Sequence, residues 1–261
     1  MEGYPLGKTC EQMKSFQEAK HCRFCDEELT GKNTVKSDAK RPALNDVCTQ
    51  QECLEKREMS CEKTLACGHA CAGVRSERKC IECIRCEEGQ QGADDYCNIC
   101  WTEPLQAGPL VKLDCGHLFH FACAKRKVES KWSGARITFG FLECPLCKVR
   151  MEAELLKPSL KPMLAIYEQV KDLAVKRLKY TGDEHSPEIT QDGNRFYKKP
   201  VEFALYFYSY FECFKCKKPY YGGQRACEVE REVDPKELIC GGSSSFFIDL
   251  SHYKHFLKRM Q

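Results

Sequence analysis

Eight potential metal ligands follow one another in a regular order between Cys97 and Cys147. Their spacing is C-x2-C-x14-C-x1-H-x2-H-x2-C-x20-C-x2-C. Ligand pairs two residues apart suit Zn²⁺, because the turn between them lets both sulfurs reach about 2.3 Å from one tetrahedral ion. Eight ligands are enough for two ions, which would brace a segment too small to fold on a hydrophobic core. We therefore expect a small zinc-stapled domain at the centre of this chain.

The order of these ligands resembles the RING finger of ubiquitin ligases, in its RING-H2 form. The resemblance implies a cross-brace, in which the first and third ligand pairs share one zinc ion and the second and fourth pairs share the other. The first ion would be held by Cys97, Cys100, His120 and Cys123. The second would be held by Cys115, His117, Cys144 and Cys147.

Three further residues match RING domains that recruit a ubiquitin-charged E2 conjugating enzyme. Such domains present an aliphatic residue between the first two cysteines, an aromatic residue late in the central helix and a proline after the seventh ligand. This chain has Ile99, Trp132 and Pro145. An exposed indole is costly surface unless a partner covers it, although each of the three could instead belong to a small core. Lys148 could contact both E2 and ubiquitin, or be an ordinary surface lysine.

The cysteine content indicates where such a chain functions. It has 21 cysteines among 261 residues, and charged residues such as Lys8 and Glu11 interrupt the first twenty positions, so no signal segment is expected. We expect a reduced, cytoplasmic setting, with the nucleus as a further possible location. Cysteines there are more often metal ligands or nucleophiles than disulfides.

Charge and hydropathy argue against two classes of partner. The 41 basic and 38 acidic residues leave a formal charge of +3, which is too balanced to indicate nucleic acid. The longest apolar stretch lies around residues 201–211, contains Glu202 and is too short to span a bilayer. No membrane segment is expected.

Residues 162–180 have the pattern of an amphipathic helix, because apolar positions recur every three and four residues. Pro162 fits the first turn of this helix, and Thr181 with Gly182 fits its end. The helix would link the RING to the last cysteine cluster.

A second helix is expected to begin after Pro200, since proline and Glu202 would lie in its first turn. Dense aromatic residues then continue toward Cys213. Aromatics at this density could form a strand instead.

The cysteines before the RING fall into two groups. One zinc site is expected from Cys22, Cys25, Cys48 and Cys53. The next stretch has a CGHAC core that resembles the NF-X1 type of zinc finger, and one or two ions are expected from Cys61, Cys67, His69, Cys71, Cys80, Cys83 and Cys86. Metal binding would supply the folding energy that a loop-rich segment lacks. These sites could form a docking surface or a plain scaffold; Cys10 and His21 have no assigned partner.

Segments across most of the chain resemble the PHR family of ubiquitin ligases. They are HCRFCDEELTGKN, KRPALNDVCTQQECLEKRE, CNICWTEPLQAGP and the stretch from RFYKKPVEFALYFYSYFECFKCKKP to ELICGG. The resemblance implies a RING cysteine relay, in which ubiquitin passes from the E2 to one ligase cysteine, then to a second, and finally to a hydroxyl group. The residue that matches the upstream relay cysteine is Cys227.

Two roles are open for Cys227. Gly222 and Gly223 permit a flexible loop, and Arg225 could favour the thiolate that transthiolation requires. Spacing alone would instead make it the fourth zinc ligand with Cys213, Cys216 and Cys240. The family implies that a cysteine near residue 243 completes that site, but this chain has serine there. The resemblance stops after residue 241, so the second relay cysteine and the hydroxyl-selecting pocket are expected to be absent.

We therefore expect an α+β chain of small zinc-stapled domains. It would act as a RING-type E3 ubiquitin ligase on an unknown protein substrate, with zinc as cofactor and with E2 and ubiquitin as partners. The alternative is a zinc-binding scaffold or inactive ligase fragment. The expected divisions are an N-terminal cysteine-rich segment (1–60), an NF-X1-like segment (61–86), a polar linker (87–96), the RING-H2 domain (97–150), a helical linker (151–200), a partial tandem-cysteine region (201–241) and an unrelated tail (242–261).

Overall fold

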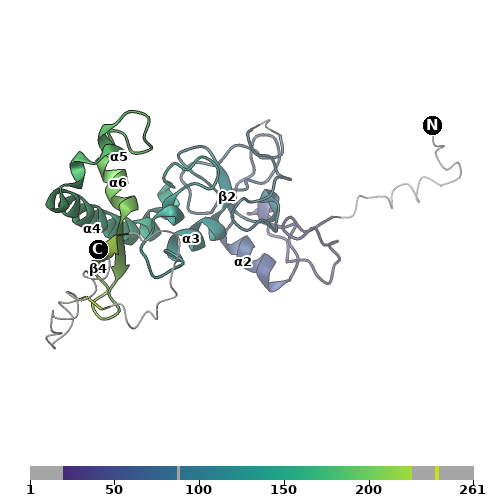
Figure 1. The fold of residues 1–261 in the computed structure, drawn as a ribbon. Helices are drawn as coiled ribbons and strands as arrows, with labels where there is room; N and C mark the ends of the chain where they lie inside the picture. Colours follow the sequence, from purple (N-terminus) through teal and green to yellow (C-terminus); the bar gives the residue numbers. More distant parts are fainter. Residues whose placement is uncertain (1–19, 87–88, 225–238, 241–261) are drawn as a thin grey trace, which may run out of the picture. The chain divides into compact units, whose positions relative to one another are not determined.

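The computed structural model describes residues 20–86, 89–224 and 239–240 (Figure 1). The described residues divide into two compact units, one within residues 1–129 and 142–160 and the other within residues 130–141 and 161–261. Helices, two small antiparallel sheets and several cysteine clusters make up the described parts, which confirms the α+β class. None of the helices in those parts combines the length and apolar composition that a membrane span requires.

The first unit begins with a segment that folds around cysteines. It contains the 3-10 helix η1 (Pro42–Leu44) and the helix α2 (Gln51–Met59), and it is otherwise built from turns and isolated β-bridges. Its core joins Cys22, Cys48 and Cys53 to Phe24 and Val47. Because α2 is largely polar and buries only its cysteine, packing around the cysteines shapes this segment.

The RING region of the same unit is a short hairpin followed by a helix. It runs through η2 (Leu105–Ala107), β1 (Leu110–Lys112), β2 (Leu118–His120) and α3 (Phe121–Glu129), and η3 (Gly140–Leu142) and η4 (Glu154–Leu156) follow. Strands β1 and β2 are antiparallel, and Val111 faces Phe119. Both side chains are fully buried, as is Val128 of α3. This small core positions two zinc-ligand pairs, one at the hairpin tip and one where β2 meets α3.

Residues 89–96, which the sequence suggests are a linker, are hydrogen-bonded to the RING region. The Gln91 side chain donates to the Leu118 carbonyl at 3.2 Å and accepts from its N–H at 2.7 Å. The Leu105 N–H donates to the Asp95 carbonyl at 2.8 Å. This segment therefore binds the hairpin through the Gln91 side chain and binds η2 through its backbone.

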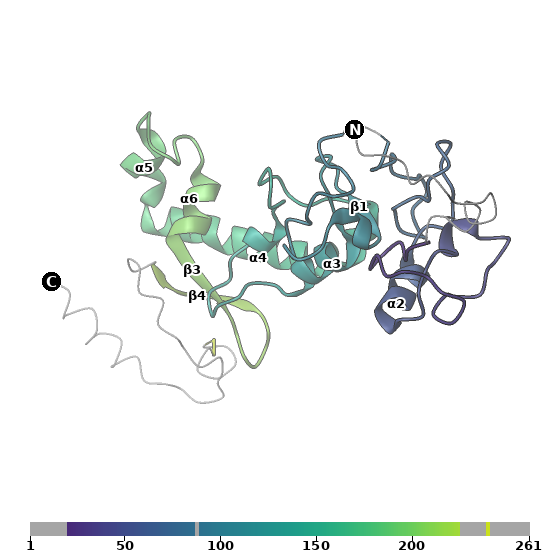
Figure 2. The same cartoon turned by 90° about the vertical axis from the view of Figure 1, so that its right-hand side faces the viewer.

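The second unit packs helices around an aromatic core. Its elements are α4 (Lys157–Thr181, which begins in the first unit), η5 (Asp183–His185), α5 (Pro187–Thr190), α6 (Pro200–Phe207), β3 (Tyr208–Glu212) and β4 (Pro219–Gln224). Helix α6 leads directly into β3 (Figure 2). Apolar residues at helical spacing on α4, namely Val170, Ala174 and Leu178, share one core with Phe203 and Tyr208.

The amphipathic helix α4 is longer than the sequence pattern indicates. It begins at Lys157, so Pro162 lies inside the helix and the prediction that it occupies the first turn is wrong. Pro158 holds an early position instead, where a missing N–H costs no hydrogen bond. The predicted end is confirmed, because α4 ends at Thr181 and Gly182 has a φ of 75°.

The aromatic stretch after Pro200 is helix first and strand second. Helix α6 ends at Phe207, and β3 then pairs antiparallel with β4, with Phe211 opposite Tyr220. Tyr208 and Tyr210 are both buried at a spacing of two. The helix expected here is thus correct for its first eight residues, whereas the residues from Tyr208 to Glu212 form a strand.

Residues 130–141 explain the long gap between the sixth and seventh RING ligands. They belong to the second unit, not to the RING core. The Ile137 N–H donates to the Tyr210 carbonyl at 2.7 Å, and Arg136 forms a β-bridge with Phe211. Residues 97–150, expected to be one domain, thus contribute to both units.

Candidate metal centres

Potential zinc ligands gather into four groups of four among the described residues. In each group the ligand atoms lie within 4.8 Å of one another. The described cysteines form no disulfides. The groups are Cys22, Cys25, Cys48 and Cys53; Cys67, His69, Cys83 and Cys86; Cys97, Cys100, His120 and Cys123; and Cys115, His117, Cys144 and Cys147. Four thiolate or imidazole donors around one point suit tetrahedral zinc.

Four C-x2-C pairs share one backbone turn. The residue after the second cysteine has a positive φ, and its N–H donates to the carbonyl of the first cysteine at 2.8 to 2.9 Å. Residues other than glycine rarely adopt this conformation, so the surrounding site must hold it. These residues are Asp26, Trp101, Lys148 and Lys217, with φ values of 60°, 61°, 63° and 57°. The turn brings both sulfurs of the pair together.

Two L-x-C-G-H segments share a second turn. Gly68 and Gly116 have φ values of 85° and 90°, which glycine adopts without steric cost. In the RING copy, the Leu113 N–H donates to the His117 carbonyl at 2.9 Å. The NF-X1-like copy has the same bond between Leu65 and His69 at 2.8 Å. In both copies the turn brings a cysteine and a histidine to one tip.

The first RING centre is largely buried, and a backbone carbonyl orients its histidine through a hydrogen bond. The His120 Nδ1 lies 3.8 Å from the Cys100 sulfur and 3.9 Å from the Cys123 sulfur. Its Nε2 donates to the Pro104 carbonyl at 3.0 Å, which leaves Nδ1 free to ligate a metal. The Cys123 thiol, together with His120, lowers the pKa of Cys97 to about 3. The arrangement favours a thiolate at the site.

The second RING centre joins the hairpin tip to the last ligand pair. The His117 Nδ1 lies 3.4 Å from the Cys115 sulfur and 3.6 Å from the Cys144 sulfur. Burial, with the neighbouring thiols Cys147 and Cys144, raises the pKa of Cys115 to about 11. Zinc binding must therefore displace protons here. The two RING groups have the ligand pairings that the cross-brace implies.

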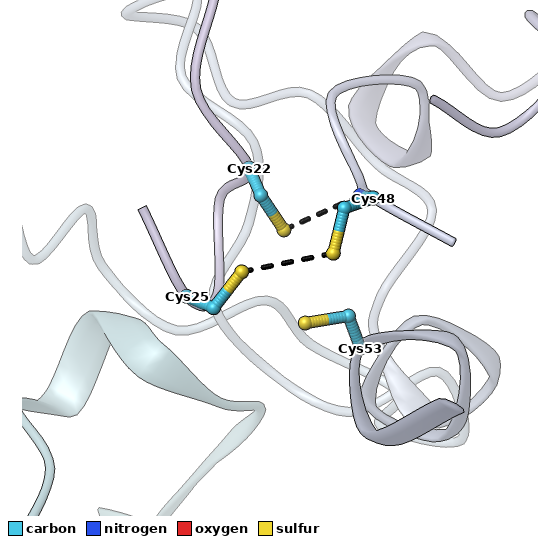
Figure 3. A group of neighbouring side chains, drawn as sticks. All are labelled: Cys22, Cys25, Cys48 and Cys53. Atoms are coloured by element: carbon cyan, nitrogen blue, oxygen red, sulfur yellow. Dashed lines mark hydrogen bonds between the residues drawn. The ribbon is translucent and has the colours of Figure 1, made fainter. Parts of the chain in front are cut away.

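The N-terminal centre draws its ligands from two loops and helix α2 (Figure 3). The Cys25 and Cys48 sulfurs lie 3.6 Å apart, and the Cys48 N–H donates to the Cys22 sulfur at 3.3 Å. Burial alone would raise the pKa of Cys22, but backbone N–H groups of Cys25, Cys48 and Phe24 lower it to about 7. Backbone donors of this kind stabilise a metal-bound thiolate.

The potential ligands of the NF-X1-like segment divide into two groups. The His69 Nδ1 lies 3.1 Å from the Cys86 sulfur and 3.7 Å from the Cys83 sulfur. The remaining members, Cys61, Cys71 and Cys80, form a separate trio. Spacing alone did not reveal this division.

A partial group lies in the second unit. The Cys216 and Cys240 sulfurs are 3.6 Å apart, and the Cys240 N–H donates to the Cys213 sulfur at 3.3 Å. Cys227 and the serine at position 243 lie outside the described residues. The choice between relay cysteine and zinc ligand thus remains a prediction.

The expected E2-contacting residues have different environments. Ile99 and Pro145 are half-buried, and Lys148 is exposed. Helix α3 ends at Glu129, so the prediction that places Trp132 late in the central helix is wrong. Lys131, which follows the helix, adopts a positive φ that a helix cannot continue through.

The two tryptophans differ in exposure. Trp132 is half-buried, packs on the core of the second unit and lies 6.4 Å from the ring of Phe141. Trp101, on the first RING turn, is 67% exposed. We did not single out Trp101 from the sequence, although its position directly after Cys100 was a signal that could have identified it.

Comparisons with known proteins agree with this geometry. Residues 95–148 match the family described as "Ring finger domain". The chain is 40% identical over 255 residues to a Danio rerio protein named E3 ubiquitin-protein ligase MYCBP2, and 37% identical over 266 residues to a Drosophila melanogaster protein named E3 ubiquitin-protein ligase highwire. Each match covers 91% of this chain and 5% of the relative. The predicted resemblance to the PHR ligases is confirmed.

Proposed function

We propose that this chain, which resembles the PHR ubiquitin ligases and has a RING finger at its centre, is a RING-type E3 ubiquitin-protein ligase of the cytoplasm. The observation that carries the proposal is the pair of interleaved four-ligand centres, Cys97, Cys100, His120 and Cys123 with Cys115, His117, Cys144 and Cys147. They coincide with the residues that match the RING family. Such a cross-brace presents rigid turns on which a ubiquitin-charged E2 can dock.

The two C-x2-C turns of the RING provide apolar contacts for the E2. The first turn presents Ile99 and the exposed Trp101, and the second presents Pro145 and Leu146, of which Leu146 is 43% exposed. Exposed apolar side chains on a rigid turn are typical of an interface. Lys148, exposed and hydrogen-bonded to the Pro145 carbonyl at 3.0 Å, would contact E2 and ubiquitin together.

Replacing Trp101 by alanine should weaken E2 binding roughly thirtyfold, because an aromatic anchor contributes about 2 kcal/mol to such interfaces. Zinc content should stay unchanged, since the indole is not a ligand. Calorimetric titration with the E2, alongside metal analysis, measures both. The matched control is Tyr180→Ala, which removes an aromatic side chain that is 83% exposed on α4.

Trp132→Ala separates the two tryptophans. We expect it to destabilise the second unit, because its indole packs on that core. One outcome would contradict this assignment: the Trp132 variant folds normally but loses E2 affinity, and the Trp101 variant binds the E2 normally. Trp132 would then be the residue that contacts the E2.

Cys227 is proposed as the upstream relay cysteine. Its thiolate would attack the carbonyl carbon of the E2–ubiquitin thioester, and the E2 cysteine would leave as a thiolate, so one thioester replaces another. The resemblance to the relay ligases supports this step. The competing role is ligation of zinc with Cys213, Cys216 and Cys240.

Incubation with E1, several E2s, ubiquitin and ATP tests the ligase and the relay together. A thiol-sensitive ubiquitin adduct that disappears in Cys227→Ser supports the relay, whereas thiol-resistant chains that persist in Cys227→Ser support direct transfer from the E2. Neither product with any E2 would contradict ligase activity and leave a zinc-binding scaffold. The control is the same reaction without E2, which should give neither product.

A further inference from the structure

Among the residues that the structure describes, three cysteines of the first unit form a group without a fourth ligand. The sulfurs of Cys61, Cys71 and Cys80 lie within 4.8 Å of one another. Cys61 and Cys71 are buried, and Cys80 is half-buried. Three thiolates occupy three of the four positions that structural zinc uses. A fourth donor is therefore needed for a closed site.

The carboxylate of Glu77 lies beside this trio. A methyl group built on Gly73 would be 2.5 Å from the Glu77 Oε2 and 3.5 Å from the Cys71 sulfur. The same oxygen accepts from the Val74 N–H at 3.2 Å, which folds the side chain back over this turn. The absence of a side chain at Gly73 thus leaves room for the carboxylate next to a sulfur of the trio.

Glu77 also differs from its acidic neighbours in its partners. Glu62 pairs with Arg75 at 3.1 Å, and Glu82 pairs with Lys112. Within the described parts of the chain, no ion pair involves Glu77, although its side chain is half-buried. A carboxylate that is partly removed from water without a cation is costly unless another positive group compensates. A zinc ion would be that group.

We propose that Cys61, Cys71, Cys80 and Glu77 together bind a further zinc ion. Zinc takes carboxylate oxygens at about 2.0–2.2 Å. The Glu77 oxygens lie outside the 4.8 Å group of the three sulfurs, so a rotation of this flexible side chain brings one of them to the fourth position. The Gly73 N–H, 3.4 Å from the Cys71 sulfur, supports the adjacent thiolate.

A nearby cation matches the charge of such a site. Three thiolates and a carboxylate leave a zinc site negatively charged. The guanidinium of Arg23 donates to the Cys71 carbonyl at 3.2 Å and to the Ala43 carbonyl at 2.8 Å, which holds it next to the trio. Its positive charge favours the ionised ligands.

The proposed site would stabilise the segment that pairs with strand β1 of the RING. Cys61 donates its N–H to the Gly73 carbonyl at 2.9 Å, and the Leu110 N–H at the start of β1 donates to the Ala72 carbonyl at 2.8 Å. Gly73 also forms a parallel bridge with Leu110. A zinc ion here would fix the strand-like segment against which β1 of the RING pairs.

Zinc counting by native mass spectrometry on the full chain, during titration with a chelator, tests the proposal. Glu77→Gln should release one ion at a chelator concentration at least tenfold lower than the wild type, and Glu77→Cys should retain that ion. The matched control Glu82→Gln, which alters an ion-paired carboxylate in the same segment, should behave as the wild type. Equal retention by Glu77→Gln and wild type would overturn the assignment, as would loss of the ion from Glu77→Cys.

Two further variants identify the ion that is lost. Cys61→Ser should release one zinc, and Cys61→Ser combined with Glu77→Gln should release no more than Cys61→Ser alone. Release of two ions by the double variant would overturn a shared site.

Cys10 lies outside the described residues and is the alternative fourth ligand. Loss of the ion in Cys10→Ser, with Glu77→Gln unaffected, would contradict the role of Glu77.

Discussion

Replacing His117 by alanine should release zinc from the second RING centre and abolish ubiquitin transfer. The His117 Nδ1 lies within 3.6 Å of the Cys115 and Cys144 sulfurs, so the variant leaves three thiols and an empty position. Loss of a residue that is hydrogen-bonded to a metal ligand typically lowers metal affinity about 10–100-fold, and loss of the ligand itself should lower it further. Metal analysis should therefore show a lower zinc content. The rate of ubiquitin discharge from the E2 should fall to the rate measured without ligase.

The control for this variant is His185→Ala. The His185 side chain is 84% exposed, lies 3.6 Å from the Glu184 carboxylate and belongs to none of the four-ligand groups. It should keep all its zinc and its full transfer rate. If His117→Ala retained its zinc, the cross-brace assignment would be wrong. If it lost zinc but still discharged the E2, the RING would not be the E2-docking element.

Replacing Arg136 by alanine should destabilise the second unit by about 2–4 kcal/mol. Its Nη2 donates to the carbonyls of Leu205, Tyr206 and Tyr208, at 3.4, 2.6 and 3.1 Å. These groups lie where α6 ends and β3 begins, so the guanidinium satisfies carbonyls that the helix leaves unpaired. Hydrogen exchange read by mass spectrometry should show faster exchange across residues 200–212.

Two comparisons make this prediction specific. Arg136→Lys should recover only part of the stability, because an ammonium group cannot reproduce the planar geometry of the guanidinium. Arg126→Ala, at an exposed position on α3, should leave exchange in residues 200–212 unchanged. Unaltered exchange in Arg136→Ala would show that these carbonyls have adequate partners without it.

The RING centres were predictable because their geometry is local. A C-x2-C or C-G-H turn brings two ligands together within a few residues, as the hydrogen bonds Trp101 to Cys97 and Leu113 to His117 show. Pairing between turns followed from the resemblance to the RING family. Glu77 could not be predicted as a possible zinc ligand from the sequence, because nothing in its spacing distinguishes it from other glutamates in a charged segment.

The sequence-based predictions were wrong where contacts with distant segments determine the secondary structure. Trp132 fits a helical position by spacing, yet α3 ends at Glu129 and the indole joins the core of the second unit. The aromatic run after Pro200 changes from helix to strand at Tyr208, where pairing with β4 becomes available. Neither partner can be identified from the residues themselves.

The sequence by itself determined which residues of the RING form the candidate zinc centres and where the turns that hold them lie, because ligand chemistry and short backbone turns depend on neighbours along the chain. Only the tertiary structure decided that residues 130–141 belong to the second unit and that Cys61, Cys71 and Cys80 separate from Cys67, His69, Cys83 and Cys86. The physical reason is that these groupings depend on contacts between segments far apart in the sequence, whose free energies no local pattern specifies.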